Sequence, residues 1–292
     1  MGERTDIAWC TSSWSPWIGC TEVSPGCDAC YARVLDARYR YGGAVHWGTG
    51  VPRHRTSEST WKRPLTWDNK AFVSGERWTV FPSLCDPFDN EVPVEWRNDF
   101  WHLISATPSL TWLLLTKRIG NAAKMVPWTV HPWSNVWIGA SVVNQEEANR
   151  DIQKLVATPA AKRFVSYEPA LNRVDWCEAL EIWWNSTTQS WVREDLPRPD
   201  WVIVGGESDQ GKHKARPFDL AWARSTVRQC RAAGVPVFVK QLGSNPFVTV
   251  PDHPAPAPGT PAGFPRTPSF KDRAGADPAE WPEDLRVQEF PA

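Results

Sequence analysis

The sequence predicts an α/β fold built as a TIM-like (βα) barrel of six or seven strand–helix units, partial or full. Six short apolar runs recur along the chain, and their first residues lie between 25 and 38 residues apart. Continuous apolar runs of this length are typical of strands that are buried on both faces of a parallel sheet. Helix-forming stretches separate several of the runs, so the spacing matches repeated strand–helix units.

The elements follow in order along the chain. The apolar piece Ile7-Ala8-Trp9 is the first predicted strand, and a loop rich in Ser, Trp and Pro follows it. A helix is predicted over 30–40, because Ala and Leu favour helical backbone there and Gly42-Gly43 would end it. Residues 43–75 show no strong period and are predicted to be irregular. The six apolar runs occupy 79–84, 111–116, 136–141, 163–168, 201–205 and 235–240, and further helices are predicted over 95–106, 144–157 and 219–233.

Two segments interrupt this rhythm. Residues 170–200 read as an insertion, with a small helix and a hairpin. Residues 244–275 are rich in proline and read as a linker. We therefore predict a barrel domain over 1–243, and a proline-rich linker with a C-terminal segment that packs on the barrel over 244–292.

Composition restricts the class of protein. The chain has 292 residues, of which 41% are hydrophobic and 22% charged, and its net charge is −1. These values indicate a globular protein. The net charge is too small to attract the whole chain to nucleic acid or to a membrane surface. No export signal and no run of about 18 apolar residues occurs, so we expect a cytoplasmic protein without a membrane span. Seven cysteines without a secretion signal favour metal or redox chemistry over a disulfide framework.

Three of the cysteines form the clearest motif. Cys20, Cys27 and Cys30 are spaced C-x6-C-x2-C, and Pro25-Gly26 allows a sharp path between them. Thiolates on a tight loop are the ligands of iron–sulfur clusters. Three ligands on a [4Fe-4S] cluster leave one iron open, and an open iron can bind a substrate or a cofactor.

Zinc is the alternative for the same loop. A structural zinc site needs four ligands in a tetrahedron. Cys10 would give a fourth cysteine, and His46 or His54 would give a histidine. Cys85, Cys177 and Cys230 are isolated and read as small buried residues.

Polar residues follow the predicted strands, where a parallel barrel places its active site. We assign catalytic roles to the charged side chains Lys117, Arg118, Glu168 and Lys240. We assign cofactor binding to Tyr31, Asp86, Ser141, Gly205, Gly206, Glu207 and Gln241. Each of these residues alone would also serve as a turn residue or a helix cap, and only their number supports an enzyme.

A basic segment over 33–63 carries interleaved aromatic residues. Basic and aromatic side chains together are typical of surfaces that bind nucleotides or single strands. The simpler interpretation is a solvated face with ordinary stacking contacts.

The cysteine loop also carries a family resemblance. Trp14-Ser-Pro-Trp-Ile-Gly-Cys20 and Pro25-Gly-Cys27-Asp-Ala-Cys30-Tyr31 resemble the signature of a phage-borne three-cysteine-motif family, which is similar to radical S-adenosylmethionine (SAM) enzymes. The resemblance extends over nearly the whole chain, through Leu113-Leu-Leu-Thr-Lys-Arg118, Phe164-Val-Ser-Tyr-Glu-Pro169, Val202-Ile-Val-Gly-Gly-Glu-Ser208 and Trp281-Pro-Glu-Asp-Leu-Arg-Val. Three features depart from these patterns. Compared with radical SAM enzymes, the first cysteine gap is six residues instead of the usual three, and Gly205-Gly206-Glu207 comes much later than the usual glycine-rich motif after the second strand. Compared with the family, Cys10 stands where a non-cysteine residue is usual.

The resemblance implies a barrel of the radical SAM type with a [4Fe-4S] cluster whose open iron binds SAM. It also implies an electron donor, a nucleotide or nucleic-acid substrate that is modified or repaired, and a partner protein encoded nearby in a phage or prophage. The competing hypothesis is a binding module without catalytic activity, whose fold is stabilised by a zinc ion or by a cluster. A third is Lewis-acid or nuclease-like chemistry, with carboxylates from Asp86, Asp89 and Glu168.

Overall fold

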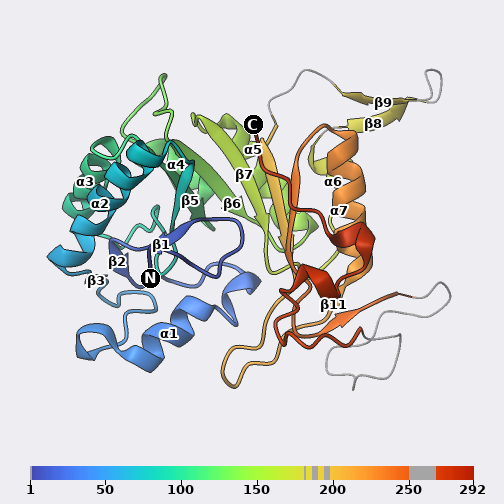
Figure 1. Cartoon of the computed structure of the whole chain (residues 1–292), viewed down its shortest axis with the longest axis horizontal. Coiled ribbons are helices and arrows are strands. Elements are labelled where there is room, and N and C mark those ends of the chain that lie inside the picture. Colours follow the sequence, from blue (N-terminus) through green and yellow to red (C-terminus); the bar gives the residue numbers. More distant parts are fainter. Residues whose placement is uncertain (1, 181, 186–189, 194–197, 250–267) are drawn as a thin grey trace. The chain divides into compact units, whose positions relative to one another are not determined.

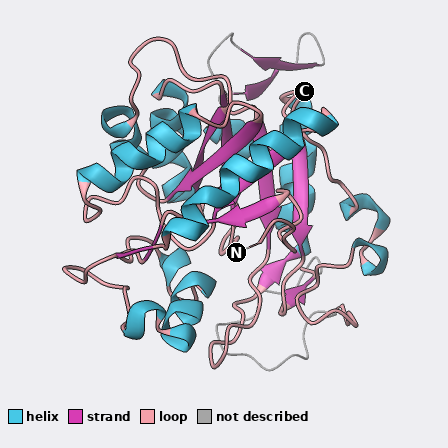
Figure 2. Cartoon of the chain, turned by 60° about the vertical axis from the view of Figure 1, so that its left-hand side comes forward, coloured by secondary structure: helices cyan, strands magenta, loops and turns pink. Residues whose placement is uncertain are grey.

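The computed structural model describes residues 2–180, 182–185, 190–193, 198–249 and 268–292. Over these ranges the chain is a mixed α/β protein in which helices accompany parallel strands (Figures 1 and 2). The chain divides into two compact units, Met1–Ala140 with Ala157–Arg163 and Ser141–Val156 with Phe164–Ala292.

The first unit is built on four parallel strands. They are β1 (Ser12–Trp14), β4 (Trp78–Pro82), β5 (Leu110–Thr116) and β6 (Val136–Ser141). Each strand pairs with the next in that order, and Ser12 lies opposite Val80 in the first pair. Every residue of β4 and β6 is buried, as expected for strands covered on both faces.

Tryptophan-rich contacts form the core of this unit. The helices are α1 (Tyr31–Tyr39), α2 (Glu58–Ser74), α3 (Val94–Ser105) and α4 (Ile119–Met125). Trp14, Phe100 and Trp112 lie with ring centroids 5.4 to 5.7 Å apart. The indole N–H of Trp14 donates to the backbone oxygen of Thr60 at 2.8 Å, which ties β1 to α2. Most tryptophans therefore act as packing residues here.

Two sequence-based predictions are wrong in this unit. Residues 7–9 do not form the first strand, because the Cys10 N–H donates to the Ile7 oxygen in a turn and β1 begins only at Ser12. Residues 43–75 are not irregular throughout. They contain α2 and the short strand β3 (His54–Arg55), which pairs antiparallel with β2 (Trp17–Ile18).

The second unit has three parallel strands with β10 (Trp201–Gly205) paired to both others. Its partners are β7 (Lys162–Tyr167) and β12 (Val237–Gln241). The main helices are α5 (Gln145–Ala157) and α7 (Leu220–Ala232).

The inserted segment, 170–200, contains the short helix α6 (Trp176–Ala179) and the antiparallel pair β8 (Ile182–Asn185) and β9 (Ser190–Arg193). A further short parallel pair joins β11 (Phe218–Asp219) to β13 (Pro246–Phe247).

The C-terminal residues lie along β12. Val239 N–H donates to the Val287 oxygen at 2.8 Å, and Glu289 N–H donates to the Val237 oxygen at 2.9 Å. Two short helices, η3 (Pro278–Glu280) and η4 (Glu283–Leu285), also belong to this segment. Trp281, directly after η3, and Leu285, the last residue of η4, are buried. Most of the predicted proline-rich linker, 250–267, lies outside the described residues. The predicted boundary at residue 243 stays a prediction.

The strand order supports the coarse fold prediction. It is β1-β4-β5-β6 in the first unit and β7-β10-β12 in the second, and the strands predicted from 79 onward are confirmed to within two residues at their starts. A parallel order with intervening helices is compatible with a partial TIM-like barrel. The radical SAM type stays a prediction. In the part of the chain that the structure describes, no helix has the length and apolar character needed to cross a membrane.

Candidate functional site

The sequence-predicted site residues form two clusters, one in each unit. The first unit holds Tyr31, Asp86, Lys117, Arg118 and the three cysteines Cys20, Cys27 and Cys30. The second holds Ser141, Glu168, Gly205, Gly206, Glu207, Lys240 and Gln241. Each cluster has its own polar contacts.

The three-cysteine loop, 20–30, is shaped by local backbone chemistry. Gly19 precedes it with φ of 118°, and a Cβ there would collide with the His46 backbone oxygen, so only glycine fits. Ser24 caps the short helix η1 (Pro25–Cys27) by accepting from the Gly26 N–H at 3.1 Å. Cys30 N–H donates to the Cys27 oxygen at 3.2 Å, and Cys30 is the residue before α1. Cys27 and Cys30 therefore share one turn.

Arg118 binds the start of this loop. Its Nη1 donates to Cys20 Sγ at 3.3 Å and to Asp86 Oδ2 at 2.9 Å, and its Nη2 donates to the Thr21 oxygen at 2.6 Å. The Arg118 and Asp86 side chains are only 10% and 8% exposed. A buried guanidinium thus holds the first cysteine from a position 98 residues away in the chain.

Asp86 is the buried counter-charge of Arg118. Its Oδ1 accepts from Thr116 Oγ1 at 2.7 Å and from the Phe88 N–H at 2.9 Å. Its Oδ2 also accepts from the Lys117 N–H at 3.3 Å. Protein donors surround both oxygens, so the carboxylate orients the strand ends of the first unit.

A second buried arginine, which the sequence did not single out, supports the other side of the loop. Arg53 Nε donates to Asp89 Oδ2 at 2.8 Å, and its Nη2 donates to Thr21 Oγ1 at 2.6 Å. Asp36 likewise holds His46, with 3.0 Å between Oδ1 and Nδ1. The sequence showed that segment 33–63 is basic, but it could not show that Arg53 points inward.

Burial raises the pKa of two thiols of the loop, Cys20 and Cys30. Burial, with the neighbouring Asp86 charge, raises the pKa of the Cys20 thiol to about 12, although the Arg118 charge acts in the opposite direction. Burial also raises the pKa of Cys30, while the N–H groups of Arg33 and Ala32 and the charge of Lys117 lower it. A metal that binds here would release protons, because thiolates are the ligands.

The donor set of the loop fits a thiolate-bound metal centre. Three thiols lie on one short loop, and Arg118 already donates to one of the sulfurs. Cationic and N–H donors stabilise thiolates and cluster sulfurs. Among the described residues, no three side chains of His, Cys, Asp or Glu are gathered as a preformed metal site. Closing the thiols around a metal would thus require side-chain movement.

Tyr31 and Cys85 lie beside the loop. The Tyr31 hydroxyl donates to the Ser83 oxygen at 2.5 Å, and burial of this hydroxyl raises the pKa of the tyrosine above its usual range. The residue as a whole is 37% exposed, so the ring keeps an open surface. Cys85 pairs with Gly19 in a parallel bridge, which brings a further thiol close to Cys20.

The second cluster centres on Glu168 and Lys240. Lys240 Nζ lies 3.1 Å from Glu168 Oε1, and these side chains are 26% and 12% exposed. Ser166 Oγ donates to Glu168 Oε2, and Ser141 Oγ donates to the Glu168 backbone oxygen, both at 3.2 Å. Oε1 itself is buried and accepts no well-aligned hydrogen bond from a described residue. The ammonium of Lys240 is thus the charge partner of this oxygen.

The glycines after β10 allow close approach of neighbouring groups. A Cβ on Gly205 would lie 2.8 Å from Glu168 Oε1, and one on Gly206 would lie 2.7 Å from the Leu242 oxygen. Gln241 Nε2 donates to the Gly206 oxygen at 2.7 Å and to Ser208 Oγ at 2.8 Å. These glycines let the ends of three strands pack together.

Glu207 has a protein partner that the sequence did not reveal. Its Oε2 accepts from Arg216 Nε and from the Arg216 N–H, each at 2.9 Å, and its Oε1 accepts from Arg216 Nη2 at 2.5 Å. A bidentate contact of this kind is strong and geometrically specific. Glu207 therefore fixes the loop after β10, and its predicted role in cofactor binding would require release of Arg216.

The comparisons with known proteins give a family but no activity. Residues 4–258 match the family model described as "Protein of unknown function (DUF5131)". No curated protein and no solved structure matches the chain. Since the match covers most of the sequence and includes both clusters, the chain belongs to the DUF5131 family.

Proposed function

We propose that this protein is an iron–sulfur enzyme of the radical SAM kind, with a [4Fe-4S] cluster on Cys20, Cys27 and Cys30. The observation that carries the proposal is the hydrogen bond from buried Arg118 to Cys20 Sγ, on a loop with two further thiols. Three thiolates would leave one iron free for SAM. Bound SAM would supply a 5′-deoxyadenosyl radical that takes a hydrogen atom from the substrate.

In this proposal, the residues of the chain bind and orient. Arg118 holds the Cys20 sulfur and compensates part of the negative charge of a thiolate-bound cluster. In the second unit, the side chains of Glu168 and Lys240 offer an acceptor and a cation to a polar ligand.

The proposal extends to an electron donor, to a nucleotide or nucleic-acid substrate, and to a cytoplasmic setting in the host of a phage, with a partner protein encoded nearby. These finer points follow from the family resemblance of the cysteine loop. Segment 33–63 combines basic and aromatic residues, which is typical of surfaces that bind nucleotides. Some of its cations are already engaged within the chain, since Arg53 pairs with Asp89, and Arg55 pairs with Asp99 and lies over the Trp61 ring at 4.3 Å.

The second candidate is a zinc-stapled binding module without catalysis. Its supporting observation is the dense hydrogen bonding of the loop by Arg53 and Arg118, which suits a purely structural site. Structural zinc contributes directly to the folding free energy. Metal content and colour separate the two candidates.

The test is anaerobic reconstitution of the full chain with iron and sulfide. We expect about four irons per chain, a brown colour, and a reduced electron paramagnetic resonance spectrum that shifts when SAM is added. Reduction with SAM present should yield 5′-deoxyadenosine. Cys20→Ala, Cys27→Ala and Cys30→Ala should lose the cluster, while the matched control Cys177→Ala should keep it.

A colourless protein with stoichiometric zinc would contradict the enzyme and support the binding module. A cluster whose spectrum does not respond to SAM would contradict SAM binding alone. Folding is followed by circular dichroism in each variant, so that loss of the cluster is separated from loss of structure.

A further inference from the structure

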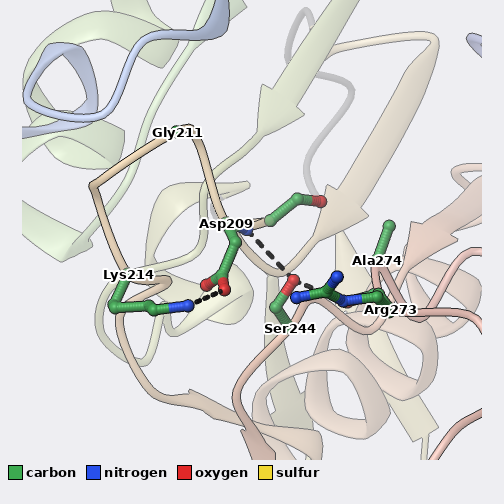
Figure 3. A pocket seen from close by; sticks show the side chains of 7 residues that line it. Asp209, Gly211, Lys214, Ser244, Arg273 and Ala274 are labelled. Atoms are coloured by element: carbon green, nitrogen blue, oxygen red, sulfur yellow. Dashed lines mark hydrogen bonds and ion pairs between the residues drawn. The ribbon is translucent and has the colours of Figure 1, made fainter.

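A polar pocket lies in the second unit, outside both clusters (Figure 3). Its volume is about 310 Å³, which is at the lower end of the range for small-molecule sites. Ser208, Asp209, Gly211, Lys214, Ser244, Arg273 and Ala274 line it. The lining is mostly polar, which suits a hydrophilic ligand.

The charges of the lining favour an anion. Lys214 and Arg273 are cationic, and Asp209 is the one carboxylate among the lining residues, so one positive charge is in excess. Figure 3 shows the side chains of Lys214 and Arg273 extending toward Asp209 and Ser244 from opposite sides. Lys214 Nζ contacts Asp209 Oδ2 at 2.6 Å, whereas the Arg273 guanidinium has no hydrogen-bond or ion-pair partner within the described ranges.

Hydrogen bonds hold the frame of the pocket and leave donors for a ligand. Ser244 Oγ accepts from the Asp209 N–H at 3.0 Å and donates to the Arg273 oxygen at 2.6 Å, so it joins two walls. Ser208 Oγ accepts from Gln241 Nε2, which leaves its proton free to donate. The available donors are thus a guanidinium fork, an ammonium and a hydroxyl, which together match the oxygens of a phosphate group.

The place of the pocket in the fold supports the same ligand. Ser208 to Lys214 follow β10, and Ser244 follows β12, which are the last two parallel strands in the order. In TIM-like barrels, the loops after the last two strands frequently bind phosphate. Next to the lining residue Ala274, the Gly275 oxygen accepts from the Leu242 N–H at 2.8 Å and from Trp281 Nε1 at 2.9 Å, which fixes the backbone on this side.

We propose that this pocket binds the phosphate group of a nucleotide or of a nucleic-acid strand, with Arg273 and Lys214 as its main ligands. The inference deepens the proposed function by naming a phosphate-bearing substrate. All of its residues belong to the second unit, and none is a cysteine. Phosphate binding is therefore measurable without a metal centre.

The test is binding of phosphate probes to the full chain by isothermal titration calorimetry at low salt. The probes are inorganic phosphate, adenosine 5′-monophosphate, adenosine and a short single-stranded oligonucleotide. We expect the phosphate-bearing probes to bind and adenosine to bind at least roughly tenfold more weakly than its monophosphate, since charged hydrogen bonds are lost. If the monophosphate binds more tightly than the oligonucleotide, the ligand is a free nucleotide. If the oligonucleotide binds more tightly, the ligand is a nucleic-acid strand.

Matched variants separate the site from general charge attraction. Arg273→Gln and Lys214→Gln should each weaken binding by roughly tenfold. Lys271→Gln and Lys212→Gln remove the same charge from exposed neighbours outside the pocket, and should change binding by less than about twofold. Equal weakening in all four variants, or no saturable binding of any phosphate probe, would overturn the inference.

The two proposals fail separately. Absent phosphate binding with an intact, SAM-responsive cluster contradicts only the pocket. A chain that binds phosphate at Arg273 but takes up zinc instead of iron contradicts only the radical SAM enzyme.

Discussion

At the scale of single residues, buried arginines organise the candidate metal loop. The motif of three cysteines is visible in the sequence because its members lie within eleven residues. The arginines that donate hydrogen bonds to this loop cannot be identified from the sequence, because Arg118 and Arg53 lie 98 and 32 residues away from the residues they contact. The same holds for Glu207, whose pairing with Arg216 depends on how the loop after β10 folds back. Residue type and spacing thus predict a candidate set of ligands, but they do not reveal the hydrogen-bond partners of that set.

The role of Arg118 is testable through stability. Arg118→Met would leave Asp86 and the Thr21 oxygen without their cationic donor in a buried site. Removing one member of a buried ion pair is strongly destabilising, so we expect the free energy of unfolding of the metal-free chain to fall by about 3 kcal/mol. Urea denaturation followed by tryptophan fluorescence measures this change.

The matched control for Arg118 is Arg63→Met on the exposed side of α2, which should stay within about 0.5 kcal/mol of the parent chain. Adding Asp86→Asn to Arg118→Met should restore part of the loss, because the uncompensated charge is then gone. An Arg118→Met chain as stable as the Arg63→Met chain would show that the buried pair does not hold the loop.

At the scale of elements, the apolar runs predicted the main strands, and the four predicted helices are confirmed to within one residue as α1, α3, α5 and α7. The runs from 79 to 240 became β4, β5, β6, β7, β10 and β12, since a strand buried on both faces leaves a continuous apolar signal. Helix α2 was missed because Pro64 and irregular polarity hide its period. Its ends carry clear signals, with Ser57 before the first turn and Gly75 after the last.

The capping of α2 gives a prediction for this element. Ser57 Oγ accepts from the Thr60 N–H at 3.3 Å, and Gly75 has φ of 68° with open space around its Cα. We expect Ser57→Ala and Gly75→Ala each to lower the free energy of unfolding by about 1 kcal/mol, through a lost cap and a strained backbone. Thermal and urea denaturation measure both changes.

Two controls make the test specific to capping. Ser57→Gly should cost only a few tenths of a kcal/mol, roughly, because glycine is tolerated at the N-cap. Thr66→Ala, on an exposed position inside α2, should change stability by less than about 0.5 kcal/mol. If Ser57→Ala behaves like Thr66→Ala, the Ser57 hydroxyl does not cap the helix.

At the scale of the whole molecule, each unit carries one cluster of site residues at strand ends, and the end of the chain closes the sheet of the second unit. β12 stands last in the strand order, and residues 287–289 pair with it in antiparallel fashion. Glu289 strengthens this contact, since its Oε2 accepts from the Val237 N–H and its backbone oxygen accepts from Trp201 Nε1. An uncovered sheet edge would be a template for aggregation.

The C-terminal segment should therefore be required for a stable monomeric chain. Trp281 is 2% exposed, and we expect Trp281→Ala to lower the free energy of unfolding by about 3 to 5 kcal/mol through the cavity that it leaves. Removal of residues 277–292 should in addition cause concentration-dependent aggregation, seen by light scattering, because the β12 edge is then exposed. Gln288→Ala, with an exposed side chain on the same segment, should change neither property. A truncated chain that stays soluble and as stable as the parent would contradict this prediction. It would mean that β7, β10 and β12 form a stable sheet without residues 277–292.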